Sequence, residues 1–300
     1  MRNTLRMSSI HTLASYIPFW IQVTRLDRPI GWIVLLWPTW IALTIAGHAT
    51  GEFKLDIWVI FTLGVIITRS AGCVVNDLTD RKFDKHVKRT RSRPITSGNL
   101  SVKNAVILAI VLFSVCLGLV LMTNIETIKL SFVTLGFAVI YPWLKRVTFW
   151  PQIGLGLAFS MAIPMAFAAY SQPLDRIVWT LFLGNVAWTL AYDTLYAMVD
   201  RDDDLLIGVK STAIMFGRHD LLAVGCSQIV ALVAFGYAFW LAGLGPLTLI
   251  GILVAIGLTV RQHIMASPRS RETCFRAFIE SHWFGAALFV GTTLGTLYKI

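Results

Sequence analysis

The chain of 300 residues is 56% apolar and only 14% charged, and its formal net charge at pH 7 is +10. Soluble domains carry about 25% charged residues, so this composition excludes an ordinary soluble globule, and its apolar content excludes a disordered chain. A membrane-spanning helix needs about 20 residues, so the length suits a multi-pass membrane protein. Basic cytoplasmic loops then explain the positive charge better than nucleic-acid binding does.

The N-terminal region has the character of a membrane-surface segment. Arg2 and Arg6 are followed by no unbroken apolar core, and Pro18 interrupts the first 24 residues, which argues against a cleaved signal peptide. We predict an interfacial segment over residues 1–26, with a short helix at 15–26 anchored by Trp20. The whole chain, residues 1–300, is expected to form a single transmembrane domain.

Nine long apolar stretches predict about nine transmembrane helices, because only helices and closed barrels satisfy the backbone in lipid. The predicted spans are 30–48, 57–75, 104–123, 127–144, 151–170, 176–199, 220–242, 246–265 and 278–298. With nine spans, 21 of the 26 Lys and Arg residues fall on the side of the N-terminus and four on the other side, while Arg69 lies within the second span. The positive-inside rule therefore predicts a cytoplasmic N-terminus.

The end of the second span carries a polar stripe. Asn76, Asp80 and Asp84 share one face if the helix continues through them, because they are four residues apart. Neighbouring carboxylates repel each other, and a divalent cation such as Mg²⁺ would relieve that repulsion. Arg69 lies about two turns deeper on the same face. We interpret it as holding an anionic substrate group, the alternative being an ion pair with an acid on another helix.

Further basic and aromatic residues follow along the chain. Arg89 and Arg93 precede Pro94 and are spaced to clamp a phosphate group, although positive-inside topology alone would also explain them. Tyr141 and Lys145 lie one turn apart at the end of the fourth span, where interfacial anchoring is the alternative interpretation.

The sixth span ends in a second acidic stripe. Asp193, Asp200 and Asp204 fall within about 40° of one another on a helix, and Tyr196 lies one turn before Asp200. Asp193 sits inside the span, where a carboxylate is costly and usually functional. Either stripe alone could be a charged loop at the membrane surface. Together with the basic residues and Mg²⁺, the two stripes indicate a site for an isoprenyl diphosphate whose tail lies among apolar helices.

On these motifs the chain resembles the UbiA-type intramembrane prenyltransferases. The matching segments are LDRPIGW (26–32), RSAGCVVNDLTDRKFD (69–84), RTRSRPITSG (89–98), YPWLKR (141–146) and AYDTLYAMVDRDDDLLIGVKSTAIMFG (191–217). The resemblance covers nearly the whole chain. It implies an all-α polytopic fold with about nine transmembrane helices around a central cavity, in a bacterial inner membrane, with the active site on the cytoplasmic side.

Within the family, the resemblance points to members that transfer a polyprenyl group from polyprenyl diphosphate to the 3-position of 4-hydroxybenzoate in ubiquinone biosynthesis. It implies that four catalytic carboxylates bind two Mg²⁺ ions, with two supporting acids at the metal sites. The catalytic four are Asp80, Asp84, Asp200 and Asp204, and the supporting two are Asp77 and Asp193. The implied diphosphate contacts are Arg89, Arg93, Tyr141, Lys145, Arg146 and Tyr196. The implied contacts to the aromatic acid are Arg69 and Asn76.

Two other functions compete with this hypothesis. The first is the same chemistry on another acceptor, such as a naphthoate, homogentisate or haem, which a panel of aromatic acids would separate. The second is a transporter that uses the acidic stripes as a cation path, which explains the acids but not the adjoining phosphate-type cations. The prenyl chain length and the oligomeric state do not follow from the sequence.

Overall fold

The computed structural model describes residues 18–297, in which all regular structure is helical and no β-strand occurs. The expected all-α fold is therefore confirmed for this part of the chain. The first half contains α2 (Phe19–Thr24), α3 (Ile30–Thr50), α4 (Leu55–Asp84), α5 (Pro94–Ser97), α6 (Val102–Leu121), α7 (Ile125–Val147), α8 (Pro151–Ser160) and α9 (Ala162–Ala169). The second half contains α10 (Arg176–Ile207), α11 (Thr212–Phe216), a 3₁₀ turn (Gly217–His219), α12 (Asp220–Leu241), α13 (Thr248–Ala266), α14 (Arg271–Glu280) and α15 (His282–Thr296).

Seven helical stretches in residues 18–297 are long and apolar enough to cross a membrane. They are α3, α4, α6, α7, α8 with α9, α11 with α12, and α13. The other two predicted spans fall on α10, which carries the second acidic stripe, and on α14 and α15, which are separated at Ser281. The predicted helix over 15–26 is helical at Phe19–Thr24, and residues 15–17, like the rest of 1–17, lie outside the described residues.

The helices that carry the acidic stripes are both longer than the predicted spans. α4 continues without a break from Leu55 to Asp84, and Arg81 and Lys82 in its last turn complement the helix dipole. α10 begins after Asp175, whose side chain accepts a hydrogen bond from the backbone nitrogen of Ile177, and it ends at Gly208 in the left-handed conformation. Both stripes are therefore helical along their full length.

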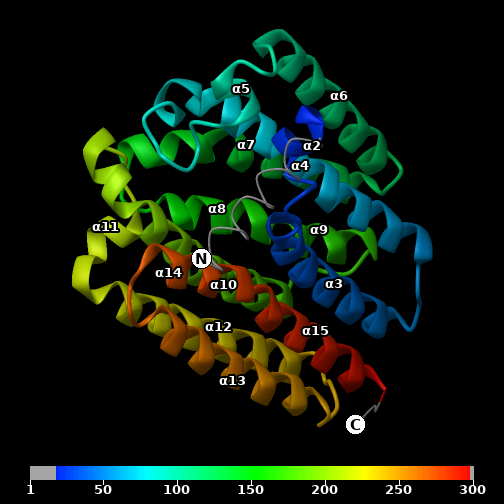
Figure 1. The fold of residues 1–300 in the computed structure, drawn as a ribbon. Coiled ribbons are helices and arrows are strands. Elements are labelled where there is room, and N and C mark those ends of the chain that lie inside the picture. The colour runs from blue at the N-terminus through cyan, green and yellow to red at the C-terminus, as the bar shows by residue number, and fades with distance from the viewer. Residues whose placement is uncertain (1–17, 298–300) are drawn as a thin grey trace.

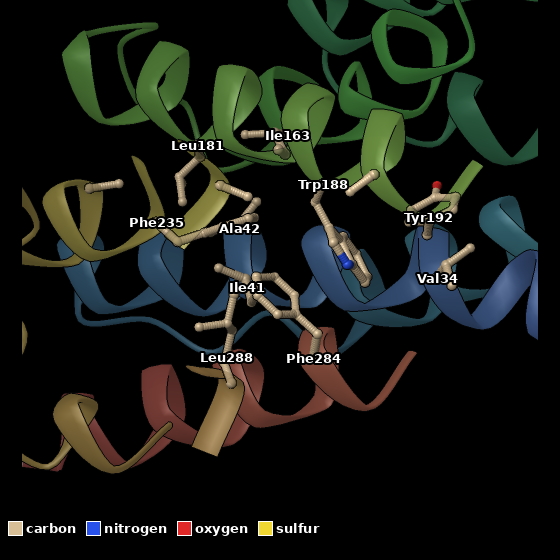
Figure 2. Packing of buried hydrophobic residues seen from close by; sticks show 14 of the residues in the cluster. Val34, Ile41, Ala42, Ile163, Leu181, Trp188, Tyr192, Phe235, Phe284 and Leu288 are labelled. Carbon is tan, nitrogen blue, oxygen red and sulfur yellow. The ribbon is translucent and has the colours of Figure 1, made fainter. Parts of the chain in front are cut away.

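The apolar core surrounds α10, which lies between α8 and α12 (Figure 1). Figure 2 shows side chains of α3, α10, α12 and α15 meeting in this core, and the rings of Trp188 and Phe284 stack with centroids 5.3 Å apart. α13 and α15 approach more closely still. A Cβ on Gly251 would lie 2.5 Å from the carbonyl oxygen of Ala287 and 2.6 Å from the Cα of Gly291. Small residues of this kind allow membrane helices to pack backbone against backbone.

α6 and α7 contrast with this core. Only 11% of the apolar stretch of each helix is buried, against 67% for Pro151–Ala169. Their exposed side chains are large and apolar, as Ile110 and Phe132 illustrate. In a membrane these surfaces would face lipid, because lipid tails are as apolar as the side chains themselves.

Candidate active site

Both acidic stripes open into one cavity of about 2130 Å³. Every site residue that the sequence analysis singled out lines it: Arg69, Asn76, Asp77, Asp80, Asp84, Arg89, Arg93, Tyr141, Lys145, Arg146, Asp193, Tyr196, Asp200 and Asp204. The remaining wall is largely apolar, and α6 and α7 contribute residues such as Phe113, Leu117 and Leu135. The part of the cavity lined by the acidic stripes and their basic neighbours is called the charged end, and the part lined by apolar residues of α6 and α7 is called the apolar arm.

The carboxylates of the α4 stripe are buried, and basic side chains neutralise them. Asp80 forms an ion pair with Lys145 of α7, and its Oδ1 lies 3.8 Å from Nη2 of Arg146. Asp84 Oδ2 lies 2.9 Å from Nη1 of Arg93. The stripe and its basic partners thus come from three separate segments of the chain.

Asp77 has a partner that the sequence analysis missed. Nη2 of Arg25 donates to both of its carboxylate oxygens, at 2.8 and 2.9 Å, and Nη1 of Arg93 lies 3.0 Å from Oδ1. The sequence analysis counted Arg25 only among the charges that set the topology. Its place immediately before LDRPIGW is the one signal that would have brought it to attention.

The α10 stripe is joined to α4 through the loop that follows α4. Nε of Arg89 donates to Oδ1 of Asp200 at 2.9 Å, and the guanidinium carbon lies 4.9 Å from the ring centroid of Tyr196. Burial acts to lower the pKa of Arg89, but Tyr196 and Asp200 outweigh it and raise that pKa above its usual value, so the guanidinium stays charged. The side chain of Asp204 forms no hydrogen bond or ion pair with any described residue.

Several polar side chains that line the cavity have no hydrogen-bond partner among the described residues. Within residues 18–297 Arg69 forms no ion pair, its Nε has no hydrogen-bond partner, and its guanidinium carbon lies 5.6 Å from the ring centroid of Phe159. No acid of this part of the chain lies within ion-pair distance of Arg69, so the alternative interpretation as half of a direct ion pair is not borne out, although Asp193 of α10 interacts with Arg69 electrostatically. The side chains of Asn76 and Asp193 likewise make no hydrogen bond to a described residue. This arrangement can receive a small anionic molecule with further polar groups.

The residues present fit a divalent cation, although the described chain contains no preformed cluster of three or more His, Cys, Asp or Glu side chains that could hold one. Oδ1 of Asp80 is buried and accepts no hydrogen bond from residues 18–297, and Asp204 is unpaired. Mg²⁺ prefers carboxylate oxygens, and it is usually bound through one or two of them together with substrate phosphates. Two carboxylates on each stripe match that requirement.

A second set of ion pairs holds the ends of helices together, and of its members Arg271 lines the cavity. Asp220 is fully buried, is paired with Arg201 of α10, and accepts a hydrogen bond from Nε of Arg269 at 2.9 Å. Arg271 pairs with Asp202 and Asp203.

Comparison with known proteins agrees with this geometry. The sequence profile of the UbiA prenyltransferase family matches residues 35–289. A protein named 4-hydroxybenzoate octaprenyltransferase from Yersinia pseudotuberculosis serotype IB (strain PB1/+) is 49% identical over 287 residues, which are 96% of this chain and 98% of the relative. A protein of the same name from Vibrio atlanticus (strain LGP32) is 51% identical over 276 residues, which are 91% of this chain and 95% of the relative.

Solved structures share the fold. A UbiA homolog from Aeropyrum pernix K1 superimposes with a TM-score of 0.77 at 20% identity, and the match covers 87% of this chain and 96% of that protein. A UbiA homolog from Archaeoglobus fulgidus, solved with GPP and Mg²⁺, has a TM-score of 0.65 at 19% identity, with 92% and 100% covered. At this level of identity the likeness concerns the arrangement of helices.

Proposed function

Since this chain belongs to the UbiA prenyltransferase family, we propose that its cavity transfers a polyprenyl group from polyprenyl diphosphate to the 3-position of 4-hydroxybenzoate and releases diphosphate. One observation carries the proposal: a single cavity contains two carboxylate stripes with basic neighbours, an unpaired arginine, and an apolar arm. These three parts suit the diphosphate, the aromatic acid and the prenyl tail. The relatives are named as octaprenyltransferases, so octaprenyl diphosphate is the first donor to test.

The charged end would hold the leaving diphosphate. The basic and phenolic groups that would contact it are Arg89, Arg93, Tyr141, Lys145, Arg146 and Tyr196. The carboxylates that would hold Mg²⁺ are Asp80 and Asp84 on α4 and Asp200 and Asp204 on α10. When bound, Mg²⁺ neutralises the charge that develops on the leaving group. Asp80, Asp84 and Asp200, which are paired with basic residues here, would exchange those partners on ligand binding, which frees the cations to face the diphosphate.

The aromatic acid would bind beside Arg69, with Asn76 as a hydrogen-bonding partner. When the allylic C–O bond breaks, the prenyl carbocation is attacked by the ring carbon ortho to the phenol. The apolar wall protects the cation from water. Asp193 and Asp204 line the cavity without an ion pair among the described residues, so either carboxylate is available to accept the ring proton.

The membrane arrangement completes the proposal. We place the chain as a single multi-pass domain of nine spans in a bacterial inner membrane, with the N-terminus and the acidic stripes on the cytoplasmic side. The uneven distribution of Lys and Arg supports this orientation. Cysteines introduced as Lys88→Cys and Glu52→Cys, both at exposed positions, should be labelled from opposite faces of sealed vesicles.

The test of the reaction uses membranes that contain the protein, with Mg²⁺, octaprenyl diphosphate and 4-hydroxybenzoate. Mass spectrometry should detect 3-octaprenyl-4-hydroxybenzoate, and EDTA or Asp80→Ala should abolish it. A product formed only with another aromatic acid would overturn the proposed acceptor. Full activity of correctly inserted Asp80→Ala protein would overturn the assignment of the metal site.

A further inference from the structure

Asp77 differs from the other carboxylates of α4 because two arginines hold it. Its side chain is 1% exposed, both oxygens accept hydrogen bonds from Arg25, and Oδ1 also lies 3.0 Å from Nη1 of Arg93. Arg89 also engages both oxygens of Asp200, but the Asp200 side chain is 13% exposed and has that one arginine as its partner. The deeper burial of Asp77 and its second arginine leave it less accessible to a metal ion. Asp80 is the opposite case, because its buried Oδ1 accepts no hydrogen bond from the described chain.

Arg93 connects Asp77 to the metal-binding stripe. Its Nη1 lies 2.9 Å from Oδ2 of Asp84 as well as 3.0 Å from Oδ1 of Asp77. The two acids are seven residues apart, about two helical turns, so they share a face of α4. Burial acts to lower the pKa of Arg93, but Asp77 and Asp84 outweigh it and raise that pKa above its usual value. The guanidinium therefore remains charged inside the cavity wall.

Arg25 is held in place from the N-terminal side. It ends α2 in the left-handed conformation, with φ at 59°, and its Nη1 donates to the carbonyl oxygen of Gln22 at 2.5 Å. Two residues earlier, Val23 is fully buried in an apolar cluster with Val74 of α4 and Ile95 of α5. The side chain of Arg25 thus extends from a packed element, which fixes its direction toward Asp77.

The hydrogen-bonding capacity of this group favours an anion. Arg25 and Arg93 both line the cavity, and Nε and Nη2 of Arg93 donate to no described residue, because Nη1 alone contacts Asp77 and Asp84. Guanidinium groups bind phosphate oxygens through paired hydrogen bonds, and they do so best when a fixed partner orients them. We propose that Asp77 is a positioning residue and not a metal ligand, and that it holds Arg25 and Arg93 as a pair that binds the diphosphate of the prenyl donor.

This inference rests on the proposed function for the identity of the anion, so its test begins with binding alone. The full-length protein in detergent is titrated with inorganic diphosphate in the presence of EDTA, and the dissociation constant is measured by calorimetry. Asp77→Asn and Arg25→Gln should each weaken diphosphate binding about tenfold or more. Arg25→Gln removes one of the two guanidinium groups, and Asp77→Asn removes the charge that orients both. Arg269→Gln is the matched control, since it also removes an arginine from a buried aspartate, but outside the cavity, and it should leave the dissociation constant unchanged.

A second measurement separates positioning from metal binding. In the prenylation assay, Asp77→Asn should raise the KM for the prenyl donor and leave the Mg²⁺ concentration for half-maximal rate unchanged, whereas Asp80→Asn should shift the Mg²⁺ dependence. Melting temperatures establish that each variant is folded. Arg25→Lys keeps the positive charge but loses the planar guanidinium, so its dissociation constant for diphosphate should lie between those of wild type and Arg25→Gln.

Three results would overturn the inference. The first is a shifted Mg²⁺ dependence in Asp77→Asn with unchanged diphosphate affinity. The second is an equal loss of diphosphate affinity in Arg25→Gln and Arg269→Gln. The third is a wild-type protein that does not bind diphosphate at millimolar concentration. Diphosphate binding that follows the predicted pattern in a protein that forms no prenylated benzoate would instead count against the proposed acceptor alone.

Discussion

Replacing Arg69 tests how the cavity recognises the aromatic acid. Among the described residues this arginine forms no ion pair and interacts with Asp193 only electrostatically, and its Nε donates to no acceptor, so its hydrogen-bonding capacity is available to a ligand. Arg69→Gln removes the charge and the planar guanidinium and puts a neutral amide of similar reach in its place. Arg69→Lys keeps the charge but offers a compact ammonium in place of the planar guanidinium.

The size of the effect follows from the hydrogen bonds that are lost. A hydrogen bond to a charged group contributes about 1.5–3 kcal/mol to binding, and about 1.4 kcal/mol corresponds to a factor of ten. We therefore expect Arg69→Gln to raise the KM for 4-hydroxybenzoate about 10- to 150-fold, and Arg69→Lys to raise it less. The KM for the prenyl donor should change much less, because Arg69 forms no hydrogen bond or ion pair with the described residues assigned to the diphosphate and interacts with Tyr141 and Tyr196 only electrostatically.

The assay compares two acceptors, 4-hydroxybenzoate and the uncharged 4-hydroxybenzamide. Wild type should prefer the acid, and Arg69→Gln should use both about equally poorly. Gly31→Ala provides a gentler perturbation, since its Cβ would lie 3.1 Å from Nε of Arg69, and it should raise the KM for the acid to a smaller extent. An Arg69→Gln enzyme that still prefers the acid as strongly as wild type does would refute the reasoning.

Two further predictions concern packing and the apolar arm. Gly251→Ala should lower the free energy of unfolding by about 1–3 kcal/mol, because its Cβ meets backbone atoms that cannot rotate away. Gly257→Ala on the same helix should leave the free energy of unfolding unchanged, because nothing lies within 4 Å of its Cβ. Thermal melting in detergent compares the two variants, and equal effects would contradict the close crossing of α13 and α15. Cys116 of α6 lines the cavity and lies 3.2 Å from the hydroxyl of Thr68, so octaprenyl diphosphate should slow its reaction with maleimide, whereas inorganic diphosphate should not. Exposed Cys226 serves as the internal control, and protection of Cys226 to the same degree would show that the tail does not select this arm.

Helical periodicity is why the two acidic stripes could be predicted from the sequence. Spacings of four and seven residues place acids on one face whatever the tertiary structure, provided that the helix continues, and α4 and α10 do continue. The depth of Arg69 follows from the same rule. The acidic and basic residues therefore gather in one cavity as the sequence predicts.

The pairing of charges could not be predicted in the same way, because it depends on contacts between distant segments. Arg25 meets Asp77 across 52 residues, and Lys145 meets Asp80 across 65. Local spacing carries no information about such contacts. The family resemblance grouped Asp77 with the metal sites, although its surroundings in the structure differ from those of Asp80.

The sparse burial of α6 and α7 determines how freely these helices can change during evolution. A side chain that faces lipid has no fixed neighbour to fit, so one apolar residue can replace another there at little cost. The faces of α6 and α7 that line the cavity are constrained by the tail they would accommodate, while the opposite faces are constrained only by hydrophobicity. Drift should therefore concentrate on one side of each helix, and a saturation scan of α6 would display tolerance and intolerance alternating with the helical period.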